Sequence, residues 1–380
     1  MQRPTIVQFN LSPTLGGAEV YTAFFCRALE ARGWPTRVVV NSAARFWDDL
    51  DFGAAERSPL RAATGTLERG DVALIHGSLP EPVLAQLAGH FVVGLAHRAL
   101  YDDSRPAYYD RADLLLAVSR HVGATLQRHG LHRVYPTPLY GVADLERGGT
   151  AGAIVAGALF DADARKLRDR VLAALFRARQ AIGAPRHLER RAGLTLGIVS
   201  RIAPLKQFPA LFECLVPILV RHPQVNVEIF GAAVGRKALA ALQAVLSPLG
   251  ARVRYWGHQR DVASAYRALD YLLTGLPERE ALGLNAIESC LAGTPVLAVA
   301  APPFSETLKD GVTGFLYVDP RKDGGADFER VLSGIENGTL FPDRAAATAH
   351  LELFSLPRFA DRVDAVMEEV ATAARRGFPA

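Results

Sequence analysis

The stretch REALGLNAIESCLAGTPVLAV, residues 279–299, places a helix start, a helical segment and a buried strand in direct succession. Gly283, with a polar asparagine two positions later, predicts that a helix begins there. The apolar run TPVLAV that follows is typical of a strand in a parallel sheet. Glu280 then lies on the loop before the helix, and Glu288 lies within it. The segment predicts an α/β unit whose helix N-terminus lies between two carboxylates.

Short apolar runs alternate with helical patterns along the whole chain. The first series of runs occupies residues 5–9, 36–40, 71–75, 91–96 and 113–118. The second series occupies residues 194–200, 225–230, 252–256, 270–274, 294–299 and 313–317. Such alternation is typical of buried parallel strands joined by crossover helices. We therefore expect an α/β protein with two tandem Rossmann-like, doubly wound parallel sheets, whose ligands bind beyond the carboxyl ends of the strands.

A domain junction is expected where glycine, proline and charged residues interrupt the pattern, at 183–193. We predict an N-terminal domain over 1–185 and a C-terminal domain over 190–356. With 380 residues, the chain is long enough for each domain to bury its own core. After the last strand the pattern is helical, and 357–376 is one long amphipathic stretch.

The composition, 49% hydrophobic and 22% charged, is that of a globular protein. No stretch of about 18 apolar residues lacks a charge, and the N-terminus MQRPTIVQFN enters a strand pattern at once. We therefore expect a cytoplasmic protein without a signal peptide. Cys26, Cys214 and Cys290 share no metal-like spacing, which favours buried thiols over disulfides or a zinc site. No metal site is expected.

The positive charge is concentrated in one segment. Residues 163–193 contain nine cations and three acids, a balance of +6, so the rest of the +4 chain sums to −2. Apolar residues recur within it at helical spacing, which predicts an amphipathic basic helix. This helix is either a solvated face or a docking surface for an anionic acceptor or a membrane. Nucleic acid is disfavoured because Phe176 is the one aromatic residue among these cations.

The spacing of Glu280 and Glu288 argues against a hydrolase. On one helix, their Cα atoms would lie about 12 Å apart along the axis, whereas glycosidase carboxyls lie roughly 5–9.5 Å apart. A helix N-terminus binds anions, and carboxylates accept hydrogen bonds from hydroxyl groups. The pattern predicts a ligand with hydroxyls at both ends and phosphate between them, the shape of a nucleotide sugar. In the alternative interpretation, Glu280 caps the helix and Glu288 is an exposed helix residue.

Two further segments carry groups suited to a phosphate. Arg201 and Lys206 follow the strand at 194–200, and together they could neutralise a pyrophosphate leaving group without a metal. A surface ion pair is the alternative. Gly16 and Gly17 precede a helix and would let a phosphate or sugar approach the backbone, although a tight turn explains them equally well.

Two histidines end predicted strands of the first domain. His76 follows the run 71–75 and His97 follows the run 91–96. A histidine at such a strand end faces the ligand side of an α/β unit, where it can bond a hydroxyl or stabilise positive charge. For His76 we favour a structural or acceptor-side role.

Five segments together resemble the retaining nucleotide-sugar glycosyltransferases of the GT-B fold, family 4. They are GGAE with its helix (16–33), AVSRHVGATL (117–126), SRIAPLK (200–206), the paired-glutamate segment with ESCLAGTPVLA (280–298), and PPFSETLKDGVTGFLY (302–317). The resemblance implies two Rossmann-like domains facing a cleft, with acceptor binding in the first and donor binding in the second. It also implies that the C-terminal helix, 357–380, crosses back and completes the first domain.

The resemblance assigns roles to individual residues. The residues implied for catalysis are His97 beside the transferred sugar, Arg201 and Lys206 on the pyrophosphate, and Glu280 on the sugar hydroxyls. The residues implied for donor binding are Gly16, Gly17, Arg201, Lys206, His258, Gln259, Glu280, Gly283, Leu284, Asn285 and Glu288. Among these, Glu288 would bond the ribose and His258 with Gln259 would lie along the base.

The activity implied is metal-independent transfer of a hexose from a nucleoside diphosphate sugar to an acceptor hydroxyl, with retention of anomeric configuration. No cofactor is expected, and a UDP-sugar is slightly favoured over a GDP-sugar. The acceptor would be a carbohydrate, a lipid-linked molecule or a small molecule, in cell-surface glycan or glycosylated metabolite synthesis. The basic segment could place the protein at the inner face of the membrane. Alternatives are a sugar-nucleotide epimerase of the same fold and a non-catalytic sugar-nucleotide-binding subunit.

Overall fold

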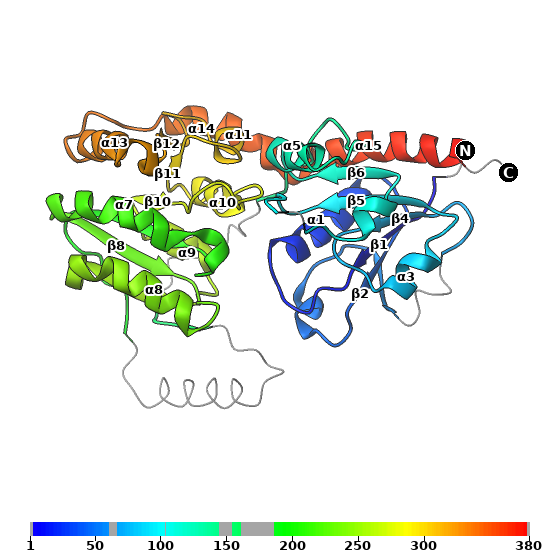
Figure 1. The fold of residues 1–380 in the computed structure, drawn as a ribbon, viewed down its shortest axis with the longest axis horizontal. Helices are drawn as coiled ribbons and strands as arrows, with labels where there is room; N and C mark the ends of the chain where they lie inside the picture. Colours follow the sequence, from blue (N-terminus) through cyan, green and yellow to red (C-terminus); the bar gives the residue numbers. More distant parts are fainter. Residues whose placement is uncertain (1–2, 61–66, 103, 144–153, 161–185, 378–380) are drawn as a thin grey trace. The chain divides into compact units, whose positions relative to one another are not determined.

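The computed structural model describes residues 3–60, 67–102, 104–143, 154–160 and 186–377 (Figure 1). The chain divides into two compact units. Unit 1 comprises residues 1–143 and 352–380, and unit 2 comprises residues 144–351. Most of the predicted basic helix within 163–193 lies outside the described residues. Among the described helices, none has the length and apolar character needed to span a bilayer.

Unit 1 contains a six-stranded parallel sheet in the order β3-β2-β1-β4-β5-β6. Its strands are β1 (Ile6–Asn10), β2 (Thr36–Val40), β3 (Glu56–Pro59), β4 (Val72–Ile75), β5 (Phe91–Ala96) and β6 (Leu114–Ala117). The five strands predicted from apolar runs are confirmed. Strand β3 was not predicted, because its sequence ERSP lacks an apolar run; it lies at the sheet edge, where a proline is tolerated.

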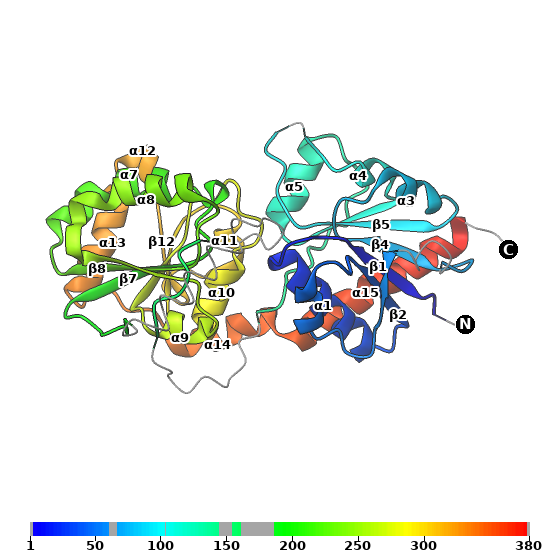
Figure 2. The same ribbon diagram turned by 90° about the horizontal axis from the view of Figure 1, so that it is seen from below.

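The helices of unit 1 lie on both faces of this sheet. They are α1 (Gly17–Ala31), α3 (Glu81–Gln86), α4 (Tyr108–Arg111), α5 (Arg120–Arg128) and α15 (Leu356–Gly377), with short 3-10 helices at Arg45–Asp49 and Glu352–Phe354. Figure 2 shows α1 and α15 on one side and α3, α4 and α5 on the other. The C-terminal helix α15 packs against α1, so the expectation that it completes the first Rossmann-like fold is confirmed.

Unit 2 contains a second six-stranded parallel sheet, in the order β12-β11-β10-β7-β8-β9. Its strands are β7 (Leu194–Val199), β8 (Val225–Phe230), β9 (Val253–Gly257), β10 (Tyr271–Leu273), β11 (Val296–Val299) and β12 (Gly314–Tyr317). All six correspond to predicted apolar runs. The predicted fold class, two Rossmann-like parallel sheets in tandem, is therefore confirmed.

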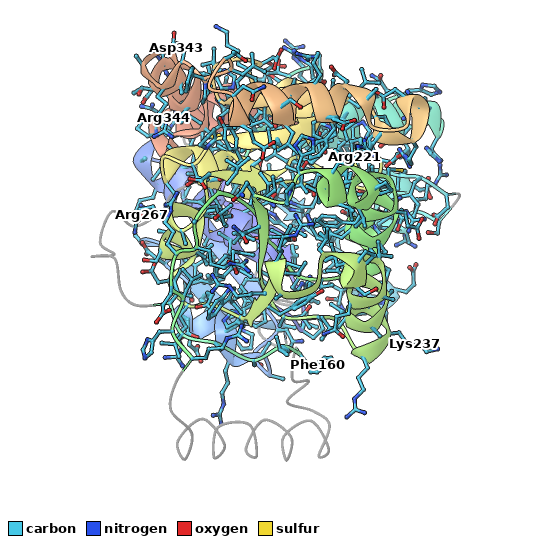
Figure 3. All side chains as sticks on the ribbon, turned by 90° about the vertical axis from the view of Figure 1, so that its left-hand side faces the viewer. Phe160, Arg221, Lys237, Arg267, Asp343 and Arg344 are labelled. Carbon is cyan, nitrogen blue, oxygen red and sulfur yellow. The ribbon has the colours of Figure 1, made fainter. Side chains whose placement is uncertain are left out.

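Two separate apolar layers cover the sheet of unit 2. The helices are α7 (Phe208–Arg221), α8 (Arg236–Leu246), α9 (Val262–Arg267), α10 (Leu284–Leu291), α11 (Phe304–Thr307), α12 (Pro320–Asp323), α13 (Ala326–Glu336) and α14 (Arg344–Leu351), with 3-10 turns at Pro204–Lys206 and Ser247–Arg252. Buried side chains of α7, α8 and α13 belong to one core, and those of α9, α10 and α11 belong to the other. Arg221 lies at the surface of α7 (Figure 3) and pairs with Glu329 of α13 at 2.7 Å.

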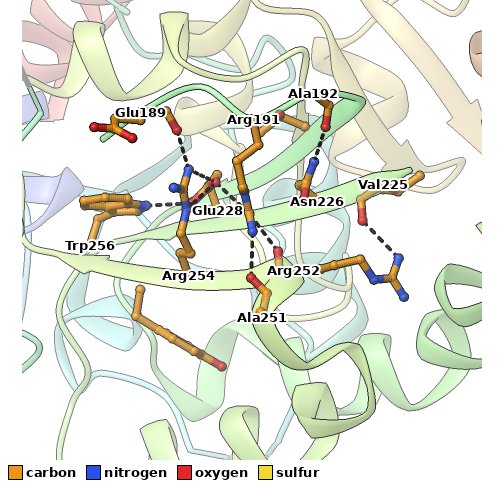
Figure 4. Close-up of polar contacts among 12 residues, drawn as sticks. Glu189, Arg191, Ala192, Val225, Asn226, Glu228, Ala251, Arg252, Arg254 and Trp256 are labelled. Carbon is orange, nitrogen blue, oxygen red and sulfur yellow. Dashed lines mark hydrogen bonds and ion pairs between the residues drawn. The ribbon is translucent and has the colours of Figure 1, made fainter. Parts of the chain in front are cut away.

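A buried carboxylate attaches the segment directly before β7 to the sheet of unit 2. Glu228 in β8 is 2% exposed and accepts hydrogen bonds from Arg191 at 2.8 Å, from Arg254 at 2.5 Å and from the indole N–H of Trp256 at 2.6 Å (Figure 4). Two guanidinium groups and one neutral donor compensate this buried charge, which would otherwise be strongly unfavourable. The network holds the segment before β7 against β8 and β9.

In both units the direction in which strands are added reverses at one point. In unit 2 the chain runs from β7 outward to β8 and β9, and then returns to place β10 on the other side of β7. Unit 1 reverses in the same way between β1 and β4. The loops that follow the two central strands diverge there, which leaves a crevice for a ligand in open α/β sheets. Lys206 and Glu280 follow the strands at this point in unit 2, and His76 follows one of them in unit 1.

Replacing Phe359 tests the attachment of α15 to unit 1. Its side chain is fully buried, with its ring centroid 5.2 Å from that of Tyr21 and 5.9 Å from that of Phe25. We expect Phe359→Ala to lower the free energy of unfolding by about 3–5 kcal/mol, because it leaves a cavity in a packed aromatic cluster. Urea denaturation measures the loss, and Arg376→Ala, at an exposed position of the same helix, is the control. Equal stability of the two variants would contradict this packing.

Candidate functional site

Two loops of unit 2 meet at the carboxyl ends of β7 and β10 through an ion pair. Lys206 ends the short 3-10 turn after β7, and Glu280 lies on the loop after β10. The ammonium Nζ of Lys206 lies 2.5 Å from Oε2 of Glu280, and their side chains are 27% and 14% exposed. The pair therefore lies where a Rossmann-like sheet binds its ligand, and it is shielded from much of the solvent.

Glycines let the backbone approach closely at this point. A Cβ on Gly275, which follows β10, would lie 2.2 Å from the carbonyl oxygen of Lys206. A Cβ on Gly231, which follows β8, would lie 2.0 Å from the carbonyl oxygen of Ser200. Both distances are far below van der Waals contact, so a larger residue would displace the loop that carries Arg201 and Lys206. Neither glycine was singled out in the sequence, although both come directly after a predicted strand.

The same carboxylate also contacts the start of α10. Oε1 of Glu280 accepts hydrogen bonds from the backbone N–H of Ala281 at 3.2 Å and of Gly283 at 3.3 Å. Gly283 has φ of 78°, a left-handed conformation that glycine adopts without strain, and the helix begins at Leu284. The predicted helix start between the two glutamates is confirmed. Glu280 thus bonds the turn that precedes α10, where the alternative interpretation had it cap the helix, and it is also the partner of Lys206.

The surroundings of Glu280 favour its charged form. Burial by itself raises the pKa of this carboxyl, but the Lys206 ammonium and the hydrogen bonds from Lys206, Ala281 and Gly283 outweigh burial. The pKa of Glu280 therefore lies below its ordinary value. At neutral pH the group is an acceptor with both oxygens available, which suits the binding of hydroxyl groups.

The second glutamate is held by a tyrosine. Glu288 lies one turn into α10, is half-buried, and accepts a hydrogen bond from the Tyr266 hydroxyl of α9 at 2.8 Å. Burial raises the pKa of Glu288, and the Tyr266 hydroxyl and Lys206 oppose this shift. The alternative of an exposed helix residue is thus wrong. Tyr266 was missed in the sequence, because nothing local to it indicates that α9 and α10 are neighbours.

Some predicted donor-binding groups have polar atoms without a partner among the residues that the structure describes. Arg201 is exposed, and among the described residues none forms a hydrogen bond or ion pair with its guanidinium, although its carbonyl accepts from the Ser200 hydroxyl at 3.3 Å. The backbone N–H groups of Leu284 and Asn285 belong to the first turn of α10, where helical N–H groups have no intrahelical acceptor. The Asn285 side chain donates to the carbonyl of Val199, the last residue of β7, at 3.4 Å. These donors at the start of α10 lie next to Glu280, and together with Lys206 they could receive an anion.

The two residues expected along the nucleotide base, His258 and Gln259, differ in exposure and in their hydrogen bonds. His258 is exposed after β9. The side-chain amide of Gln259 instead donates to the backbone carbonyls of Val155 at 3.1 Å and Trp256 at 2.9 Å. Gln259 therefore attaches the segment around residue 155 to the end of β9, and its amide nitrogen is occupied.

The predicted residues of unit 1 lie at the carboxyl edge of its sheet. Gly16 precedes α1 with extended backbone, and Gly17 is the first residue of that helix. His76 and His97 follow β4 and β5, and Nδ1 of His76 lies 3.1 Å from Nε2 of His97. His76 is 3% exposed, and the structural or acceptor-side role favoured for it stays a prediction. Gln8, which bonds His76, was missed, although a glutamine inside an apolar strand was a visible signal.

Comparison with known proteins links unit 2 to one family. Residues 186–334 match the family model described as glycosyl transferases group 1. A D-inositol 3-phosphate glycosyltransferase of Streptomyces scabiei is 34% identical over 189 residues, which cover 46% of this chain and 40% of the relative. That of Streptomyces griseus is 27% identical over 335 residues, which cover 82% and 63%. The matched region thus spans less than two thirds of either relative.

Solved structures show the same fold. HepE of Anabaena, in complex with UDP and glucose, superimposes with a TM-score of 0.68 over 97% of this chain and 100% of that chain, at 17% identity. Sucrose-phosphate synthase of Thermosynechococcus elongatus superimposes with a TM-score of 0.64 over 98% and 100%, at 18% identity. The chain therefore has the two Rossmann-like units of the GT-B architecture.

Removing Lys206 should change the ionisation of Glu280. In Lys206→Met we expect the pKa of Glu280 to rise, because burial remains and the ammonium is lost. In the wild type, the lowered pKa means that Glu280 stabilises the fold above its unfolded-state pKa of about 4.3. This contribution disappears as pH falls through the folded-state pKa. The variant should lose about 1.5–3 kcal/mol of unfolding free energy at pH 7.

Carboxyl-resolved NMR titration measures this pKa, with Glu280→Gln to assign the resonance. Lys237→Met, at an exposed position of α8, is the matched control and should leave the titration unchanged. A Glu280 pKa that is the same with and without Lys206 would refute the electrostatic coupling.

Proposed function

We propose that this protein transfers a sugar from a nucleoside diphosphate sugar to an acceptor hydroxyl. The observation that carries the proposal is the Lys206–Glu280 pair at the N-terminus of α10, at the point where the strand order of unit 2 reverses. Cation, carboxylate and free amides there match a ligand that has both phosphate and hydroxyl groups. The family match over residues 186–334 includes this whole cluster and supports the proposal.

Each group has a role consistent with its surroundings. Arg201 and Lys206 would bind the diphosphate, together with the free amides at the start of α10. Glu280, which its neighbours hold ionised, would accept hydrogen bonds from hydroxyls of the transferred sugar. Glu288, held by the Tyr266 hydroxyl, would accept hydrogen bonds from the ribose.

Stabilisation of the leaving group is the main contribution expected from the protein. As the glycosidic bond breaks, negative charge grows on the diphosphate, and oriented cations and amides stabilise it more than they stabilise the bound donor. We further propose retention of configuration: the acceptor attacks on the face from which the diphosphate leaves, and a diphosphate oxygen takes the acceptor's proton. A protein base is not needed in this scheme, nor is a metal, since Arg201 and Lys206 can neutralise the charge.

A UDP-sugar is the favoured donor. The structure of HepE holds UDP and glucose, and that of a pneumococcal O-GlcNAc transferase with the same fold holds UDP and GlcNAc. A thermal-shift screen against UDP, GDP, ADP and dTDP sugars identifies the base. Labelled donor is then incubated with and without an acceptor panel that includes D-inositol 3-phosphate. Acceptor-dependent transfer supports the proposal, whereas isomerisation alone or binding alone would replace it with an epimerase or a binding protein.

Lys206→Ala should lower turnover by on the order of a hundredfold, because a cation positioned at the developing charge is lost. The folded state should persist, as judged by circular dichroism, so the loss would appear in kcat. The control is Lys237→Ala, since Lys237 lies on the surface of α8 (Figure 3). Activity of Lys206→Ala within threefold of that control would remove Lys206 from the mechanism.

A further inference from the structure

A continuous chain of hydrogen-bonded polar side chains crosses the sheet of unit 1; Gln8 and His76 are buried, and Thr36 and His97 at its two ends are half-buried. The Thr36 hydroxyl of β2 donates to the carbonyl of Ile6 at 3.0 Å. The amide nitrogen of Gln8 in β1 donates to Thr36 at 3.2 Å and to the sulfur of Cys26 at 3.0 Å. The amide oxygen of Gln8 lies 2.8 Å from Nε2 of His76, whose Nδ1 lies 3.1 Å from Nε2 of His97. The chain leads from the start of β2 to the ligand edge of the sheet.

Which atom donates and which accepts at each step of this chain follows from the hydrogen bond between Thr36 and the carbonyl of Ile6. A carbonyl oxygen can only accept, so Thr36 uses its single proton on Ile6 and must accept from Gln8. The amide nitrogen of Gln8 therefore faces Thr36, and its oxygen faces His76. An amide oxygen also only accepts, so Nε2 of His76 must carry a proton.

The same reasoning sets the tautomer of the outer histidine. A neutral imidazole with a proton on Nε2 has a lone pair on Nδ1, so Nδ1 of His76 accepts. The proton in the bond between the two rings then belongs to Nε2 of His97. The other nitrogen of His97, Nδ1, carries a lone pair and has no partner among the residues that the structure describes. His97 is half-buried and follows β5 at the ligand edge of the sheet.

The surroundings keep both rings neutral and in place. Burial lowers the pKa of His76 well below its ordinary value, and the neighbouring His97 adds to this shift. Burial also lowers the pKa of His97 to about 3. The Tyr21 ring packs edge-on against His97 with centroids 4.9 Å apart, and the Phe25 ring packs in the same manner against His76 at 5.8 Å. Rotation of either ring would break both its hydrogen bond and this packing.

We propose that Gln8 and His76 are positioning residues that hold His97 as the Nε2–H tautomer, so that its Nδ1 is a fixed acceptor for a ligand hydroxyl. A lone pair in this position accepts from an alcohol and repels the oxygens of phosphates and carboxylates. His97 would therefore select a hydroxyl of the sugar or of the acceptor, and would not bind the diphosphate. This assignment of the hydroxyl rests on the proposed glycosyl transfer, whereas the tautomer does not.

The tautomer can be read directly by NMR of the full chain labelled with ¹⁵N-histidine, at neutral pH and without ligand. We expect the proton of His97 on Nε2, with an unprotonated Nδ1. In Gln8→Met, Nε2 of His76 loses its acceptor, and a buried N–H without a partner is unfavourable. His76 should then carry its proton on Nδ1 and donate to His97, whose own proton moves to Nδ1. In His76→Gln, an amide that accepts from His97 and donates to Gln8 should preserve the wild-type tautomer.

Kinetics of the labelled-donor assay test the consequence. We expect His97→Ala and Gln8→Met each to lower kcat/KM on the order of tenfold, the effect of one lost hydrogen bond. The double variant should be no worse than His97→Ala, because Gln8 acts through His97. His76→Gln should remain within threefold of the wild type. Melting temperatures show whether each variant is folded.

The NMR spectra and the kinetic assay test the proposal independently of each other. A His97 proton on Nδ1 in the wild type, or an unchanged His97 tautomer in folded Gln8→Met, would overturn the proposal. Should Gln8→Met not fold, the wild-type and His76→Gln spectra still decide the tautomer. Additive losses in the double variant would reduce Gln8 to a purely structural residue. If His97 has the expected tautomer but the protein transfers no sugar, the proposed function is refuted. The positioning of His97 by Gln8 and His76 would still stand.

Discussion

The ion pair between Lys206 and Glu280 connects the fold of unit 2 to its proposed chemistry. It joins the loops after β7 and β10, which are adjacent strands that lie far apart in the sequence. One oxygen of the Glu280 carboxylate contacts the Lys206 ammonium. The other accepts hydrogen bonds from the backbone N–H groups of Ala281 and Gly283, just before α10. A single carboxylate thus orients both a cation and a helix N-terminus. Burial makes the arrangement demanding, because either charge alone would be unfavourable there.

The close approach of these loops depends on small residues as much as on charge. Gly275 leaves room for the Lys206 backbone, and Gly231 leaves room for the Ser200 carbonyl. Gly283 provides the left-handed turn from which α10 begins. Preorganised donors stabilise a growing charge only when they are held near their working positions before the reaction. Backbone geometry therefore contributes to the proposed mechanism alongside the charged side chains.

The two units apply the same principle with different chemistry. In unit 2, charged groups meet at the point where the strand order reverses, and half-buried guanidinium groups around Glu228 attach the segment before β7 to the sheet. In unit 1, neutral groups meet at the corresponding point, in the chain from Thr36 through Gln8 and His76. A chain of neutral groups fixes which atom donates and which accepts at its end, whereas an ion pair acts on a ligand through its charges. The first suits recognition of hydroxyls, and the second suits a diphosphate.

Most of the secondary structure could be read from the sequence, because it depends on local patterns. Eleven predicted strands are present, and the helix start at Gly283 follows from the conformational freedom of glycine. The edge strand β3 was missed since ERSP has no apolar run. Of the site, the sequence indicated Arg201, Lys206 and the two glutamates as a cluster, from their positions after strands.

The partners of these residues were decided by tertiary structure alone. Lys206 and Glu280 are 74 positions apart, His76 and Gln8 are 68 apart, and Tyr266 reaches Glu288 from another helix. Gln259 was expected along a base, and its amide instead bonds backbone carbonyls. The sequence by itself determined which segments are strands and where the polar groups follow them, since both are local properties. Strand order determined which of those groups meet, because hydrogen bonding and charge pairing depend on distances in space.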